Sequence, residues 1–135
     1  MRNGYSRKTA NRGGMKLKSF DVDLTICKVA GIEGLDLSHE LTFLCVTDEE
    51  VSFVCPTAFA PENAVAREDG WRTFRIEGVL DFSLKGILAR ISGVLAEAEI
   101  GIFVVSTYNT DYVLVKADDL QPALGALAQA GYALA

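Results

Sequence analysis

The sequence lacks several features that mark common protein classes. Its 135 residues include a single histidine and three cysteines. Charged residues or glycine interrupt each apolar stretch well before the roughly 20 residues that a membrane helix needs. No phosphate-binding glycine motif and no zinc-ligand spacing is present. We therefore expect a protein with no cofactor, no metal site and no membrane partner.

An excess of positive charge is also missing. The chain carries 13 basic and 18 acidic residues, for a formal net charge of -5. All of the excess acid lies beyond residue 14, so the body of the protein repels the phosphates of nucleic acids at short range. Nucleic acid is therefore not an expected partner.

The cysteines and the first residues bear on where the protein works. Cys27, Cys45 and Cys55 are odd in number and sit inside apolar, strand-like runs, which predicts reduced core residues in a cytoplasmic protein. Residues 1–14 offer almost nothing to bury and predict a disordered tail. The alternating acids that follow are unlike the apolar region of a secretion signal, so export is not expected.

Catalytic chemistry finds little support in the sequence. His39 lies in a loop rich in Gly and Asp, and no serine or cysteine beside it has the context of a nucleophile. The acidic run at 48–50 lacks the ligand pattern of a calcium loop and reads as a charged hairpin tip. We expect that the protein is not an enzyme.

The first half of the chain shows strand periodicity. Residues 20–27 alternate polar and apolar side chains, which is typical of a half-buried strand. Two β-rich runs, 41–46 and 51–55, flank a polar loop and predict a hairpin. If Val46 pairs with Val51, apolar side chains lie on both faces of this hairpin and both faces need cover.

Two short segments connect these strands to the second half. Residues 30–40 have turn chemistry and predict a loop or one helical turn. Pro61 opens a segment, 61–64, that suits the first turn of a short helix. Residues 71–77 then alternate polar and apolar side chains and predict a further strand.

The second half contains the clearest helix. Apolar residues recur at helical spacing from Leu84 to Ala98, and Asp81 or Ser83 can cap the helix N-terminus. A second hairpin follows at 100–107 and 112–116. Its runs are almost wholly apolar, so we expect both strands to be central in a sheet.

The end of the chain completes a recognisable order. A helix begins after an Asp-Asp pair and is closed by Gly131, and residues 132–134 return as an edge strand. From Arg72 the order is β, α, β, β, α, β, the α+β ferredoxin-like arrangement. The first half keeps remnants of the same order, which predicts an internal duplication whose first copy has lost a helix.

Specific motifs in the second half resemble a known family. The segments 78–81, 86–89 and 93–98 resemble the opening strand, loop and helix of ACT domains. The run 106–112, Ser-Thr-Tyr-Asn-Thr-Asp-Tyr, is similar to the branch that includes bacterial tandem-ACT proteins and the cytosolic arginine sensors of animals. The resemblance implies two fused ACT-like subdomains with antiparallel sheets, a degenerate one at 15–70 and an ACT domain at 71–135.

The resemblance also implies a function. ACT domains typically bind amino acids between the first loop and helix of one module and a strand of a neighbouring module, often across a homodimer. It therefore implies a regulatory sensor of an amino acid or similar small ligand, with Thr107, Tyr108 and Asp111 contributing to the site. The alternative is a ligand-free module of the same fold that serves for dimerisation or for docking a partner.

Physical arguments support some of these positions. The helix N-terminus near Gly86 presents unpaired N–H groups to a ligand carboxylate, and glycine permits close approach. Asp111 can pair with a cationic group of a ligand, although a turn aspartate also bonds its own backbone. Tyr108 and Phe82 can wall a side chain, or simply pack. The candidate ligand-binding residues are Asp81, Phe82, Ser83, Leu84, Gly86, Thr107, Tyr108, Thr110 and Asp111.

Two further expectations concern the turn at Glu99 and RNA binding as a competing function. Glu99 occupies a turn where many ACT domains have glycine, a position that requires a positive φ. RNA-recognition motifs share the ferredoxin-like order, but Phe103 and Tyr112 lie in no basic aromatic run. RNA binding is therefore not expected.

Overall fold

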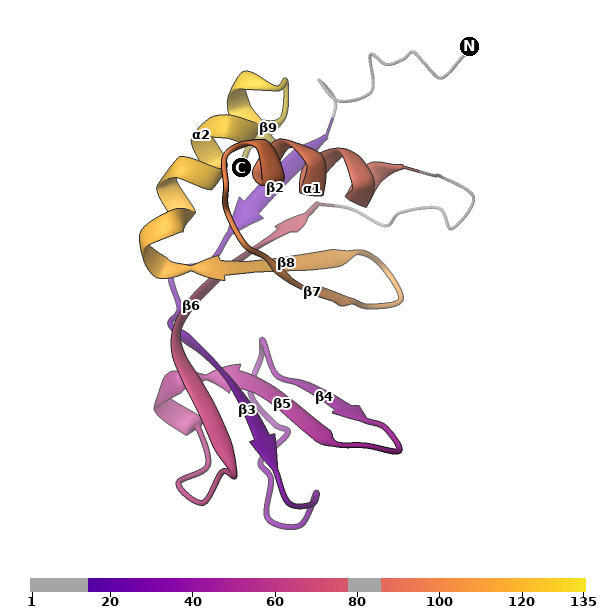
Figure 1. Ribbon diagram of the computed structural model, residues 1–135, viewed down its shortest axis with the longest axis vertical. Helices are drawn as coiled ribbons and strands as arrows, with labels where there is room; N and C mark the ends of the chain where they lie inside the picture. The colour runs from indigo at the N-terminus through magenta and orange to yellow at the C-terminus, as the bar shows by residue number, and fades with distance from the viewer. Residues whose placement is uncertain (1–14, 78–85) are drawn as a thin grey trace. The chain divides into compact units, whose positions relative to one another are not determined.

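The computed structural model describes residues 15–77 and 86–135, and these residues form two compact units (Figure 1). Unit 1 contains residues 15–20 and Thr73–Ala135, and unit 2 contains Asp21–Arg72. The predicted disordered tail, residues 1–14, lies outside the described residues. Within them, no helix is long and apolar enough to cross a membrane.

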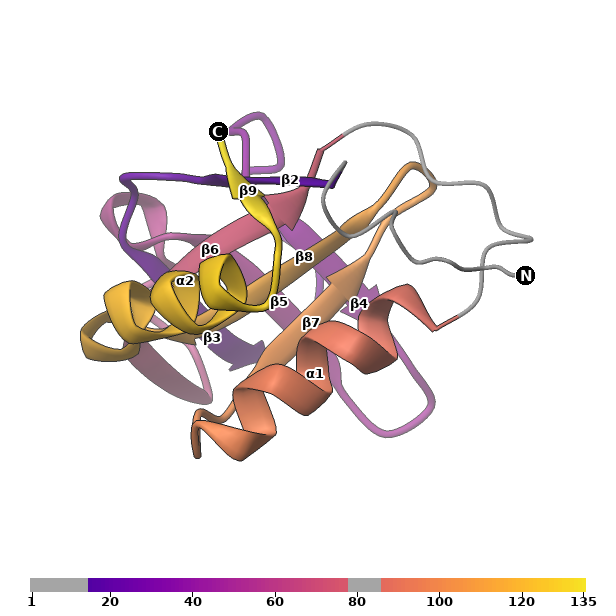
Figure 2. The same ribbon diagram turned by 90° about the horizontal axis from the view of Figure 1, so that it is seen from above.

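Unit 1 is a sheet with two helices on one face (Figure 2). The helix α1 (Ile87–Glu97) connects β6 to β7, while β8 lies between these two strands, which is the split βαβ arrangement. The order β6-α1-β7-β8-α2-β9 confirms the predicted ferredoxin-like fold. The sheet order is β7 (Phe103–Ser106), β8 (Asp111–Lys116), the end of β6 (Ala66–Ile76), β2 (Lys16–Ser19) and β9 (Ala133–Leu134).

The expectation that both strands of the second hairpin are central is only half correct. β8 has partners on both sides, whereas β7 pairs only with β8 among the described strands. β7 is short, and its side chains are half-buried or exposed. The apolar side chains of β7 are therefore partly buried on a strand at the edge of the described sheet, not on a central strand.

Strand β2 was not expected from the sequence. It pairs antiparallel with β6 and parallel with β9, so it separates two strands that the simple ferredoxin-like order makes neighbours. Leu17 is buried there and joins the core. The lysines around Leu17 are too polar for a recognisable strand, and only the tertiary contacts make the segment a strand.

The predicted strand over residues 20–27 is confirmed only from Leu24 onward. The chain leaves β2 at Ser19 and begins β3 (Leu24–Val29) only after a break. In this break Asp21 and Asp23 both form ion pairs with the guanidinium of Arg72, at 3.0 and 2.8 Å. Residues 15–20 consequently lie with unit 1, not with the rest of the predicted subdomain 15–70.

The core of unit 1 lies between the helices and the sheet. Ile87, Ile91 and Leu95 are buried at spacings of four residues on α1, as the sequence periodicity predicts. The helix α2 (Leu120–Gln129) buries a similar stripe. Sheet residues of this core include Leu17, Phe74, Ile76, Val113 and Val115.

The exit from α1 confirms the expectation for Glu99. Its φ is 62°, in the left-handed region. The turn is closed by the N–H of Ile100, which donates to the oxygen of Leu95 at 2.9 Å. Glu99 therefore holds a backbone conformation that costs a non-glycine residue about 1–2 kcal/mol.

Unit 2 is a sheet of order β4 (Phe43–Val46), β5 (Val51–Pro56), β3 and the beginning of β6. Val46 lies opposite Val51, which confirms the predicted hairpin register. Its small core contains Cys27, Val29, Phe53 and Cys55. Whether the two units are copies of one ancestral module stays a prediction.

Two predictions for unit 2 were wrong. The short helix expected at 61–64 does not form; a 3₁₀ turn at Thr57–Phe59 takes its place. Its first N–H, from Thr57, donates to the oxygen of Asp23 at 2.8 Å, which fixes the turn directly after β5. Cys45, expected in the core, is exposed, because β4 lies at the end of the sheet order and presents Cys45 outward.

Candidate functional site

The predicted ligand-binding residues are only partly within the described structure. Four of them, Asp81, Phe82, Ser83 and Leu84, lie outside the described residues. The other five belong to unit 1. They are Gly86 at the start of α1, and Thr107, Tyr108, Thr110 and Asp111 on the β7–β8 hairpin.

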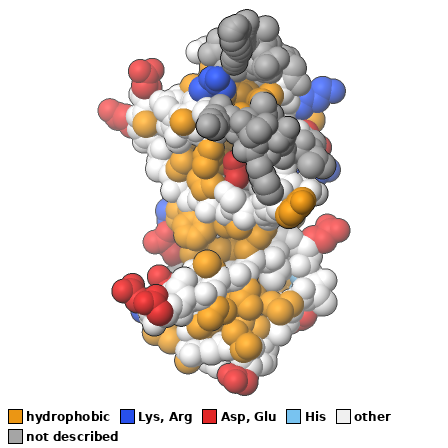
Figure 3. Space-filling view, turned by 90° about the vertical axis from the view of Figure 1, so that its right-hand side faces the viewer, with side chains coloured by type: hydrophobic (Ala, Val, Ile, Leu, Met, Phe, Trp, Pro, Cys, Tyr) orange, Lys and Arg blue, Asp and Glu red, His pale blue; other side chains and the backbone are white. Residues whose placement is uncertain are grey.

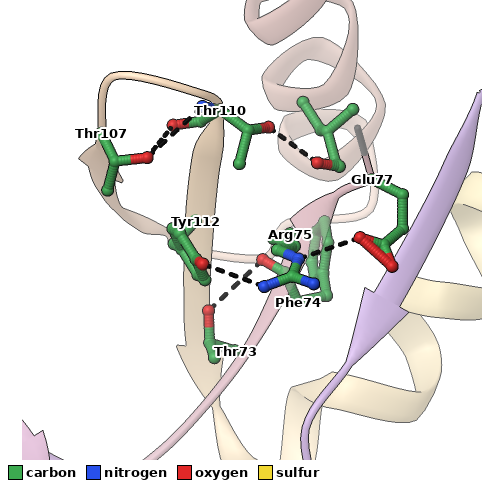
Figure 4. Close-up of polar contacts among 8 residues, drawn as sticks. Thr73, Phe74, Arg75, Glu77, Thr107, Thr110 and Tyr112 are labelled. Atoms are coloured by element: carbon green, nitrogen blue, oxygen red, sulfur yellow. Dashed lines mark hydrogen bonds and ion pairs between the residues drawn. The ribbon is translucent and has the colours of Figure 1, made fainter. Parts of the chain in front are cut away.

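The tip of this hairpin is a closed turn (Figure 4). The N–H of Thr107 donates to the oxygen of Thr110 at 2.8 Å. The Thr107 hydroxyl donates to the same oxygen at 3.0 Å and accepts the N–H of Thr110 at 3.3 Å. Because its hydroxyl is used in this way, Thr107 holds the turn.

Thr110 fastens the hairpin tip to strand β6. Its hydroxyl donates to the main-chain oxygen of Ile76 at 2.7 Å, and the residue is 7% exposed. Ile76 ends β6, and the chain continues from there into the segment that contains residues 81–84. The bond therefore brings the hairpin tip to the point where that segment begins.

Asp111 begins β8 opposite Ser106. The Ser106 hydroxyl donates to Oδ1 of Asp111 at 2.6 Å. Within the described residues, Oδ2 makes no hydrogen bond. Asp111 thus does not form the self-capping turn that was the alternative reading, and one carboxylate oxygen stays available.

Gly86 and Tyr108 differ in how well they fit a binding role. Gly86 has a φ of 81° at the N-cap of α1, a conformation that glycine adopts without strain, and no side chain of the described residues caps this end. The Tyr108 ring is 80% exposed, so it forms no wall of a closed pocket in this conformation.

A small polar hollow beside the hairpin was missed by the sequence reasoning. Its volume is about 200 Å³, and it is lined by Arg75, Glu77, Thr107, Asn109, Thr110 and Tyr112. A signal was present, because the alternation over residues 71–77 puts Arg75 and Glu77 on one face of the strand and Phe74 and Ile76 on the other.

Arg75 is held firmly at the edge of this hollow (Figure 4). Its Nε donates to Oε2 of Glu77 at 3.0 Å, and Nη1 donates to the Tyr112 hydroxyl at 3.1 Å. These bonds, the one to Tyr112 first and then the one to Glu77, raise the pKa of the guanidinium further. The hollow therefore contains a permanent cation.

The comparisons with known proteins agree with this architecture. The sequence profile of the ACT domain family matches residues 66–129, which confirms the resemblance of the second half of the chain to ACT domains. Members of this family commonly bind amino acids for regulation. The matched segment includes β6, both helices and the hairpin that carries Thr110 and Asp111.

A curated human relative is the cytosolic arginine sensor for mTORC1 subunit 1, with 45% identity over 51 residues. The match covers 37% of this chain and 16% of the human protein. The chain thus spans a small part of the length of this relative.

Two solved structures share the fold over nearly the whole chain. Protein Atu0741 of Agrobacterium tumefaciens is 31% identical with a TM-score of 0.81, covering 90% of this chain and 92% of that one. The ligand-free regulatory subunit of aspartate kinase from Thermus thermophilus has a TM-score of 0.62 at 13% identity, covering 84% of this chain and 95% of that one. The second likeness concerns the fold alone.

Proposed function

We propose that this chain is a non-catalytic regulatory module that senses an amino acid or a similar small ligand. The observation that carries the proposal is the bond between Thr110 and Ile76, which brings the β7–β8 hairpin tip to the start of the segment before α1. In ACT domains, as the sequence resemblance implies, ligands bind between such a loop and a strand. The match of residues 66–129 to the ACT domain family supports the same function.

The proposed roles follow from chemistry. Asp111, with Oδ2 free of bonds within the described residues, accepts a cationic group of the ligand in a charge-assisted hydrogen bond. The segment 81–84 and Gly86 receive the ligand carboxylate on main-chain N–H groups at the start of α1. Thr107 and Thr110 hold the hairpin in place, and Tyr108 covers the ligand.

We further propose that the ligand is a basic amino acid. The curated relatives are named as arginine sensors, and Asp111 offers the negative charge that a guanidinium or ammonium group needs. We also propose a cytoplasmic location, where Cys27, Cys45 and Cys55 remain the free thiols that the structure contains.

Thermal unfolding with each of the twenty amino acids in turn tests this function. A ligand that binds only the folded state, present at about 100 times its Kd, adds about 2.7 kcal/mol of stability. That corresponds to a rise in Tm on the order of 10 °C for a chain of this size. Arginine or lysine is expected to produce such a rise.

Two matched variants test whether the rise in Tm depends on Asp111. Asp111→Asn should reduce the rise to about half or less, whereas Asp118→Asn, at a surface aspartate in the turn before α2, should keep it. A Tm that no amino acid changes would contradict the sensor function and favour the docking module.

One observation favours homodimer formation by either kind of module. Strand β4 ends the sheet order of unit 2, and Leu44 and Val46 on it are 37% and 61% exposed. The face of unit 2 drawn in Figure 3 carries several exposed apolar side chains. Edge strands of this kind readily pair with another chain.

We propose that two copies pair through β4. Sedimentation of the wild type should show a dimer that Val46→Lys converts to monomer. Val65→Lys, at another exposed valine of unit 2, should leave the dimer intact. A monomeric wild type would contradict this arrangement.

A further inference from the structure

A cation lies close to two aromatic rings on the sheet face of unit 1 that faces away from the helices. Phe74 and Ile76 point into the helix-covered core, so Arg75 between them points to the other face. Its guanidinium carbon is 5.2 Å from the centre of the Phe20 ring and 5.9 Å from that of Tyr112. The two rings are 6.4 Å apart.

This arrangement fixes the orientation of the Arg75 guanidinium. The rings favour the cation electrostatically and restrict its movement. Nε and Nη1 are used by Glu77 and Tyr112. Nη2 bonds to no acceptor in the part of the chain that the structure describes. One edge of the planar group is therefore left with N–H donors for another molecule.

The charges around Arg75 do not cancel. Glu77 contributes one negative charge at 3.0 Å from Nε. Lys18 adds a second positive charge, with Nζ 5.3 Å from the centre of the Phe20 ring. The cluster of Lys18, Arg75 and Glu77 thus carries a net charge of about +1, and an anion is the ligand that it attracts.

The size and lining of the hollow limit what that anion is. The volume of about 200 Å³ is below the roughly 300–1,000 Å³ of pockets for drug-sized molecules. Since a water molecule takes about 30 Å³, the volume corresponds to about seven water molecules and suits a molecule of similar size. Besides the charged pair, the lining is polar, and the carboxamide of Asn109 lies at the turn.

We propose that this hollow, here named the Arg75 hollow, binds a small carboxylate, with the guanidinium of Arg75 as its anchor and the Asn109 carboxamide as a second donor. Planar guanidinium and carboxylate groups match in geometry and form strong paired hydrogen bonds. The carboxylate is that of a free organic acid or the α-carboxylate of an amino acid.

The Arg75 hollow is separate from the site proposed around Asp111. Asp111 is on the same face of β8 as Val113 and Val115, which belong to the helix-covered core. Tyr112, which lines the hollow, is on the opposite face. The two sites thus lie on opposite faces of β8, although Thr107 and Thr110, which hold the hairpin of the Asp111 site, also line the hollow.

Nuclear magnetic resonance of the full chain tests the proposal. Sodium acetate, glycine and methylammonium chloride are titrated separately at constant ionic strength, while the Nε–H signal of Arg75 and the amides of 107–112 are followed. Acetate and glycine should move these signals saturably, and methylammonium should not. Tighter binding of glycine than of acetate would show that Glu77 contacts the ammonium group of the amino acid. Equal binding would show that the hollow recognises the carboxylate alone.

Variants complete the test. Arg75→Lys keeps the charge but loses the planar fork, so the affinity for acetate should fall at least tenfold. Arg90→Lys, an exposed arginine on α1, should bind as the wild type does. Asn109→Ala, in the exposed turn, should weaken binding severalfold even if Arg75→Lys fails to fold. No saturable movement of the Arg75 signal, or binding by Arg75→Lys equal to the wild type, would overturn the proposal.

Discussion

Thr110 and Ile76, 34 residues apart in the chain, are joined by a buried 2.7 Å hydrogen bond from the threonine hydroxyl to the main-chain oxygen. The other hydrogen bonds of Thr107 and Thr110 lie within the turn, whereas this bond joins the hairpin tip to a different strand, β6. It fixes the hairpin tip, which carries Asp111, against the end of β6. If the hairpin tip binds a ligand as proposed, the geometry of that site depends on Thr110, which need not touch the ligand.

Replacement of Thr110 tests this dependence. Thr110→Val keeps the shape but removes the donor, and the buried oxygen of Ile76 then loses its partner at a cost of about 1–3 kcal/mol. Urea unfolding should show this loss, and any ligand response should weaken with it. Thr110→Ser should retain most of the stability because the hydroxyl remains.

Thr42→Val provides the control for that variant. The Thr42 hydroxyl makes only a long, exposed bond of 3.4 Å to the oxygen of Glu40. Its removal should change the free energy of unfolding by less than about 0.5 kcal/mol. Equal effects of Thr110→Val and Thr42→Val would show that the Thr110 bond is not structurally important.

Glu99 offers a stabilising substitution. Because its φ is 62°, Glu99→Gly removes backbone strain and should raise the free energy of unfolding by up to about 1 kcal/mol, after the entropic cost of glycine. Glu97→Gly, two residues earlier in α1, should instead lower it by about 1 kcal/mol. Chemical denaturation of both variants gives the comparison, and destabilisation by both would be inconsistent with strain at Glu99.

The three cysteines should differ in reactivity. Cys45 is exposed, while Cys27 and Cys55 are buried. Burial raises the pKa of the Cys55 thiol to about 11, so little thiolate forms at neutral pH. Iodoacetamide labelling of the native protein, followed by mass spectrometry, should modify Cys45 alone. Labelling of Cys55 as fast as Cys45 would contradict the buried core of unit 2.

Asp69 should make unit 2 sensitive to acid. Its pKa is held below the usual value by the hydrogen bond from Thr25 first, at 2.7 Å, and then by bonds from Arg67. A depressed pKa means that folding favours the carboxylate. The stabilisation is present above the unfolded-state pKa of about 4 and is lost as the pH falls through the lower folded-state value.

The matched variants for this prediction are Asp69→Asn and Asp48→Asn. The wild type should be more stable than Asp69→Asn above about pH 4, and the difference should shrink on further acidification. Asp48→Asn, in the exposed β4–β5 turn, should follow the wild-type pH profile. A stability difference for Asp69→Asn that does not change with pH would rule out the ionised carboxylate as its source.

Local patterns made part of this structure predictable. The register of Val46 opposite Val51 follows from two β-rich runs around a short polar loop. The buried stripe of α1 follows from its helical spacing. The positive φ of Glu99 was expected from the family pattern at that turn. In each case the information lies within a few residues.

Non-local contacts explain what the sequence did not reveal. Lys16–Ser19 becomes a strand only because β6 and β9 lie on either side of it. The Arg75 hollow depends on Tyr112, which is 37 residues further along the chain, and on a ring just after β2. Alternation places Arg75 on a strand face, but it does not say which side chains from other strands meet it there.

Isothermal titration of the amino acid that most raises the Tm, into the wild type and Asp111→Asn, tests the proposed sensor function most directly. The wild type should bind saturably, and Asp111→Asn should lose at least tenfold in affinity, because the ligand's cationic group would lose its charged partner. Equal affinity in both proteins, or no heat of binding in either, would contradict an amino-acid site at Asp111.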